Sequence, residues 1–87
     1  MTSSRKEFFR LLPLALADYE FVVDGNSIHF TYANGKLSID ITKETERKIA
    51  SLALPVLHVS FTFVDIDHQS QQNFLNHFFK VYQRGGG

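Results

Sequence analysis

The chain has 87 residues, no Cys, and a net charge of zero, with nine Lys plus Arg and nine Asp plus Glu. This length predicts one domain with a modest core. The absence of Cys excludes disulfides, thiolate zinc sites and cysteine nucleophiles. Nine Phe and three Tyr indicate a core built largely from aromatic rings, which bury a large area per residue.

The first predicted element is a helix over residues 4–12, with a kinked continuation to residue 16 as the alternative. Ser4 and Glu7 have the spacing of a capping box, and apolar residues then recur at helical spacing. Pro13 is the reason for the shorter limit, because proline inside a helix removes a hydrogen bond and clashes with the preceding turn.

Three strands are predicted next, over residues 19–23, 28–32 and 37–41. Apolar and weaker positions alternate in each of them, as in strands with one buried face. Asp24-Gly25-Asn26 separates the first two strands and Asn34-Gly35 the second and third. Asn-Gly is the strongest short hairpin signal, because both positions tolerate positive φ. The pattern therefore predicts an antiparallel meander.

Three further elements are predicted: a helix over 42–51, a strand over 56–66, and a helix that begins at Asp67 or Ser70 and ends near residue 84. In the middle helix, Glu44 and Lys48 form an i,i+4 pair in the favourable order. Pro55 biases the residue before it towards extended backbone, so this helix should stop near Ser51. A strand through 49–54 is the alternative.

The predicted order is therefore α-β-β-β-α-β-α. It describes an α+β fold, a two-layer sandwich whose four-stranded, mostly antiparallel sheet has helices on one face. Residues 1–84 are expected to form the single domain, and residues 85–87 a flexible glycine tail.

The strand order and the core complete the predicted fold. The right-handed crossover rule places the last strand parallel to the third and beside the first, giving the order 3-2-1-4. Aromatic residues of the last strand and last helix are expected to pack together with the first helix. They are Phe61, Phe63, Phe74 and Phe78.

No cofactor, metal or catalytic residue is assigned from the sequence. His29, Asp40 and His58 point to the open face of the predicted sheet and are potential zinc ligands, but no tight ligand spacing supports a site. His58 and Ser60 also share a face, yet the chain has no nucleophile elbow and no glycine-rich phosphate loop. Solvated polar residues are the simpler interpretation.

Nucleic acid and membrane are not expected as partners. The balanced charge predicts no long-range attraction to either, and no segment reaches the ~18 apolar residues of a membrane span. The element order resembles that of double-stranded RNA-binding domains, but the last helix starts without the Lys cluster of that family. The N-terminus imitates a secretion signal, although Glu7 and Arg10 interrupt its apolar stretch. A cytoplasmic protein is therefore expected.

The expected function is that of a small non-catalytic protein–protein interaction module. Its partner is an unknown protein or a second copy of the chain, bound through the open sheet face or a sheet edge. The expected face is weakly polar and consists of Val22, Thr31, His58, Ser60, Thr62 and Val64.

The alternative function is that of a carrier or accessory protein whose C-terminal glycine tail is recognised by a partner enzyme. Arg84-Gly85-Gly86-Gly87 resembles the Gly-Gly ends of ubiquitin-like modifiers and sulfur carriers. Deleting the tail would leave an interaction module active and would inactivate a carrier.

Overall fold

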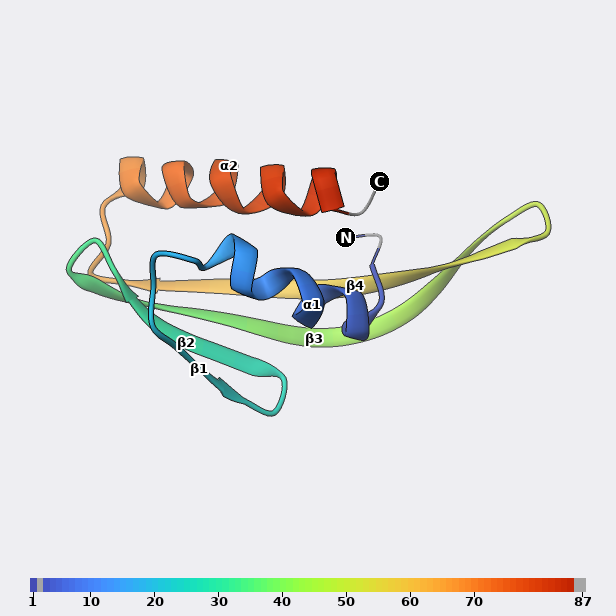
Figure 1. Cartoon of the computed structure of the whole chain (residues 1–87), viewed down its shortest axis with the longest axis horizontal. Coiled ribbons are helices and arrows are strands. Elements are labelled where there is room, and N and C mark those ends of the chain that lie inside the picture. The colour runs from blue at the N-terminus through green and yellow to red at the C-terminus, as the bar shows by residue number, and fades with distance from the viewer. Residues whose placement is uncertain (2, 86–87) are drawn as a thin grey trace.

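The computed structural model describes residue 1 and residues 3–85. Its elements are α1 (Arg5–Ala15), β1 (Phe21–Asp24), β2 (Ser27–Tyr32), β3 (Gly35–Ile49), β4 (Leu52–Val64) and α2 (His68–Gly85). The strands form an antiparallel four-stranded sheet, which confirms the α+β class and the predicted meander. Helix α2 runs along β4, α1 lies in front of the longer strands, and the β3–β4 hairpin projects beyond both helices (Figure 1).

The helix predicted over 42–51 is wrong, because β3 continues to Ile49 and β4 begins at Leu52. Ala50, with φ 54°, lies in the tight turn between them. Glu44 and Lys48 lie an even number of residues apart, so the spacing that suits a helix also places them on one face of a strand. Pairing with β4 decides between the two structures.

The predicted strand order 3-2-1-4 is also wrong, since the order is β1-β2-β3-β4. The prediction depended on a crossover helix, which parallel neighbours require. A tight turn between β3 and β4 makes them antiparallel neighbours instead. Their register places Leu37 opposite Phe63 and Ile39 opposite Phe61.

A bulge interrupts β3 in the middle of its long pairing with β4. Ile41 pairs with Val59 and Lys43 with His58, so Thr42 is an extra residue. The Thr42 hydroxyl donates a hydrogen bond to the His58 carbonyl at 3.1 Å. One extra residue reverses the side-chain alternation of β3 beyond the bulge, because successive side chains point to opposite faces.

The core is one cluster of buried apolar residues from both helices and from β2, β3 and β4. Its largest fully buried side chains are Phe8, Leu12, Leu16, Ile28, Leu37, Ile39, Leu57 and Phe78. Phe61 and Phe63 are half-buried, less than predicted. Both rings still lie 6.3 Å from Phe74, measured between ring centroids, and Phe61 lies 5.2 Å from Phe78.

Both helices begin at the predicted caps. The Ser4 hydroxyl accepts a hydrogen bond from the Glu7 amide at 3.1 Å, and α1 then continues through Pro13 to Ala15, as in the longer alternative. At α2, the Asp67 carboxylate accepts hydrogen bonds from the Ser70 hydroxyl and amide. These bonds stabilise the ionised carboxylate and lower the pKa of Asp67.

Tyr82 joins the two helices, because its hydroxyl donates a hydrogen bond to the Phe8 carbonyl at 2.8 Å. Burial raises the pKa of Tyr82, so the folded state keeps the phenol neutral at a pH where the unfolded chain ionises. The free energy of unfolding falls as the pH rises wherever the unfolded state binds fewer protons than the folded state.

For Tyr82 we therefore expect the free energy of unfolding to fall as the pH rises above about 10. Urea unfolding of Tyr82→Phe should show a shallower fall, and equal slopes in both proteins would contradict this assignment.

Candidate interaction surface

The exposed side of the sheet carries rows of side chains that cross the strands. The strand register gives these rows as Thr31–Lys36–Val64, Val22–His29–Ser38–Thr62, and Asp24–Ser27–Asp40–Ser60. The six residues predicted for this face, Val22, Thr31, His58, Ser60, Thr62 and Val64, are all exposed. Strand parity alone is enough to find them, because each lies on a strand that the sequence predicts.

The three potential zinc ligands of this side do not meet. His29 Nδ1 lies 2.9 Å from the Ser38 hydroxyl, and His58 Nε2 lies 3.3 Å from the Thr45 hydroxyl. The Asp40 carboxylate accepts a hydrogen bond from the Ser27 hydroxyl. Each group thus has a neutral hydroxyl neighbour of its own, and no group of three metal-ligating side chains occurs among the residues described.

A shallow depression lies on this side where β1, β2 and β3 meet. Its lining includes Glu20, Val22, His29, Thr31, Lys36 and Ser38. One acidic and one basic residue balance each other there, so the depression presents no field of a single sign to a charged ligand. Its shape and charge suit contact with another surface better than enclosure of a small molecule.

We call the projecting part of the β3–β4 hairpin, residues 43–56, the arm. The arm places a strip of apolar residues on the same side as the rows: those of β4 by simple alternation, and the one of β3 because the bulge reverses the alternation of that strand. This apolar strip consists of Ile49, Leu52, Leu54 and Val56. Ile49 is 47% exposed and Leu52 is 63% exposed. A two-stranded hairpin is marginally stable by itself in water. Exposed apolar side chains that lie next to one another mark a site of contact with another molecule.

Sequence reasoning misses the arm because it assigns residues 42–51 to a helix. The signal that would find it is the alternation of apolar residues in Leu52, Leu54 and Val56. Short alternating runs compete with helical spacing, and here the charged residues favour the wrong choice.

The C-terminal tail lies partly outside the described residues. Helix α2 includes Gly85, whereas Gly86 and Gly87 are not described. The predictions that the tail is flexible and that an enzyme recognises it therefore stay predictions. Among the described residues, no helix is long and apolar enough to cross a membrane.

No protein family, curated protein or solved structure matches this chain.

Proposed function

We propose that the chain is a non-catalytic protein–protein interaction module that binds a partner protein through the exposed side of the sheet and the arm. In this proposal both helices cover the opposite face as one layer of a two-layer sandwich. The burial of Leu37 and Ile39 on that face and the exposure of Thr62 and Val64 on the other support this arrangement. The lack of Cys fits a reducing compartment, and the cytoplasm is the proposed location.

The observation that carries the proposal is the position of the apolar strip relative to the rows. Leu54 and Val56 precede His58 and Ser60 at alternate positions of β4, so all four lie on the same side of the sheet. The bulge at Thr42 places Ile49 of β3 on that side as well. Protein–protein interfaces combine apolar and polar surface, and this side of the sheet offers both next to each other. The rows provide hydroxyl and imidazole groups for hydrogen bonds, and the strip provides area for the hydrophobic effect.

The test is affinity capture from the native extract with the double variant Leu52→Glu/Leu54→Glu. We expect it to capture the partner at least about tenfold less well than wild type, since carboxylates in an apolar contact cost at least that much in affinity. Ala53→Glu is the control, because it adds a carboxylate on the opposite face of the same strand, between the two substituted positions. The melting temperatures of all variants should stay close, since these side chains lie outside the core.

Equal capture by wild type and by the double variant would contradict a role for the arm. Deletion of residues 85–87 belongs in the same experiment. If only that deletion abolished capture, the carrier function would replace the one proposed here.

A further inference from the structure

The outer edge of β4 has backbone groups that point away from the sheet. The Met1 amino group donates to the Leu57 carbonyl at 2.7 Å, and the Leu57 amide donates to the Met1 carbonyl at 2.8 Å. The backbone of Leu57 therefore points away from β3. Because backbone groups alternate along a strand, those of Val59, Phe61 and Phe63 point to the same edge. Within the described part of the chain, no hydrogen bond reaches them from outside the sheet.

Pro55 supports this orientation, because it lies an even number of residues from Leu57 and its missing N–H therefore falls on the outer edge. Proline is tolerated in sheets where its nitrogen faces away from the neighbouring strand. The strand otherwise lacks the usual protection of an edge, since residues 52–64 contain no Lys, Arg, Asp or Glu. A long uncharged edge is a template for pairing with another strand.

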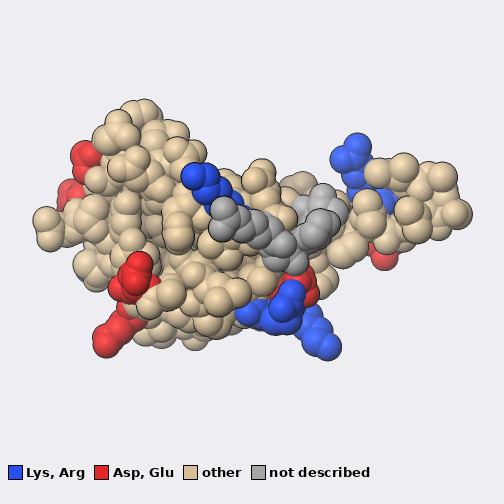
Figure 2. All heavy atoms as spheres, turned by 45° about the horizontal axis from the view of Figure 1, so that its top comes forward, with Lys and Arg blue, Asp and Glu red and all other residues tan. Residues whose placement is uncertain are grey.

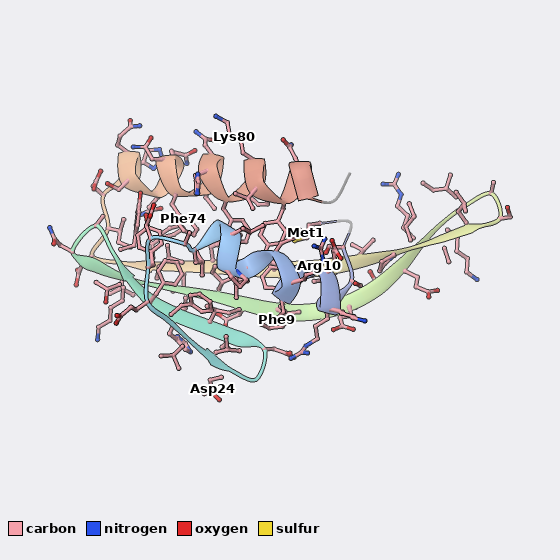
Figure 3. The ribbon with its side chains drawn as sticks, viewed as in Figure 1. Met1, Phe9, Arg10, Asp24, Phe74 and Lys80 are labelled. Carbon is pink, nitrogen blue, oxygen red and sulfur yellow. The ribbon has the colours of Figure 1, made fainter. Side chains whose placement is uncertain are left out.

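Helix α2 adds an apolar flank beside this edge. Phe79 is 40% exposed, and its ring centroid lies 5.9 Å from that of Phe61. Leu75, one turn earlier, is half-buried. Lys80 is the one Lys, Arg, Asp or Glu between His68 and Gln83, and it points away from the sheet, whereas Phe74 points towards it (Figure 3).

The space-filling view agrees with this distribution of charge. In Figure 2, charged side chains lie at the left end, along the lower margin and at the base of the arm, and a blue side chain lies near the middle of an otherwise tan upper surface. Depletion of charge at an aromatic surface is the compositional mark of an interface core.

We infer that two copies of this chain associate through their β4 edges, pairing antiparallel about a two-fold axis at Phe61. In this dimer Val59 lies opposite Phe63 of the second copy, and the sheet continues across both copies. The axis is perpendicular to the sheet, so the two α2 helices lie on the same side and face each other through Leu75 and Phe79. Met1 occupies the edge at Leu57 and thereby limits the new ladder to the part of β4 that follows.

A second copy fits this surface for reasons of charge, symmetry and size. The chain has no net charge, and β4 has no charged residue, so self-pairing opposes no like charges. Antiparallel pairing of a strand with itself is isologous, as most natural dimers are. Stable interfaces use about 20–30 residues on each side. The part of β4 that follows Leu57 supplies some of that number, and the exposed flank of α2 supplies more. This surface is distinct from the arm, so the dimer does not depend on the proposed partner.

The test is sedimentation equilibrium of the full chain over a wide concentration range. Wild type should reach twice the monomer mass of 10.0 kDa. Phe79→Glu should weaken the dimer about tenfold or more, as expected for a central aromatic contact. Val59→Pro should also weaken the dimer, because it removes a backbone N–H that points to the outer edge. If Val59→Pro does not fold, the comparison of Phe79→Glu with wild type is the deciding measurement. Lys80→Glu is the matched control on the same helix and should dimerise like wild type.

An isotope-filtered NMR experiment on mixed labelled and unlabelled chains tests the register. Ser60 lies opposite Thr62 of the second copy, so their α-protons should give an intermolecular cross-peak. A wild type that stays monomeric at every concentration would overturn the inference. So would a dimer of unchanged affinity in Phe79→Glu.

Discussion

Phe78→Ala is expected to lower the free energy of unfolding by about 3–5 kcal/mol. Phe78 is 0% exposed and lies at the centre of the aromatic cluster. Its ring centroid is 4.6 Å from Tyr82, 5.2 Å from Phe61 and 5.7 Å from Phe74. Truncation would leave a cavity between both helices and β4, which the surrounding rings can fill only in part. Total stabilities of small domains are about 5–15 kcal/mol, so the variant should be largely unfolded at elevated temperature.

Urea unfolding followed by circular dichroism measures this loss. Leu14→Ala is the control, because it also shortens an apolar side chain on a helix, but Leu14 is 63% exposed. Surface substitutions of this kind usually change stability by less than about 0.5 kcal/mol. If Phe78→Ala cost no more than Leu14→Ala, the position of α2 against the sheet would be contradicted.

Both helices and the first strands could be predicted because their signals are local. Alternation and turn residues are enough for β1, β2 and the start of β3, and Ser4 and Asp67 mark the beginnings of the helices. Each of these signals depends on residues only a few positions apart, as do capping boxes and tight turns.

Residues 42–55 could not be predicted in the same way, because pairing between two strands decides their structure and no turn signal marks that pairing. Residues 42–51 contain charges whose spacing suits a helix and a strand alike. Only their pairing with residues 52–58 selects the strand, and tertiary context of this kind commonly overrides local propensity. The sequence pattern therefore does not predict the arm and its apolar strip, whereas strand alternation does predict the six exposed face residues.

Gly35 shows how a correct signal can have the wrong register. Asn34 and Gly35 are predicted as the two central residues of a turn, but the residues with positive φ are Ala33, at 50°, and Asn34, at 66°. Gly35 already belongs to β3 and is buried. A Cβ placed there would collide with the Val64 carbonyl oxygen and would lie 2.5 Å from Cγ1 of Ile66. The glycine is therefore required because β3 approaches the end of β4 too closely for any side chain.

Gly35→Ala is accordingly expected to lower the free energy of unfolding by about 3 kcal/mol or more, since the backbone of Val64 cannot move without disturbing the sheet. Gly25→Ala is the matched control. Gly25 has φ 61°, but a Cβ there would meet nothing within 4 Å. Its cost should be limited to the left-handed backbone, about 1–2 kcal/mol. Urea unfolding of both variants separates the two causes, because a crowding effect must exceed the backbone effect. Equal losses would mean that Gly35 serves the turn after all, and that the close approach of Val64 is not what requires a glycine at this position.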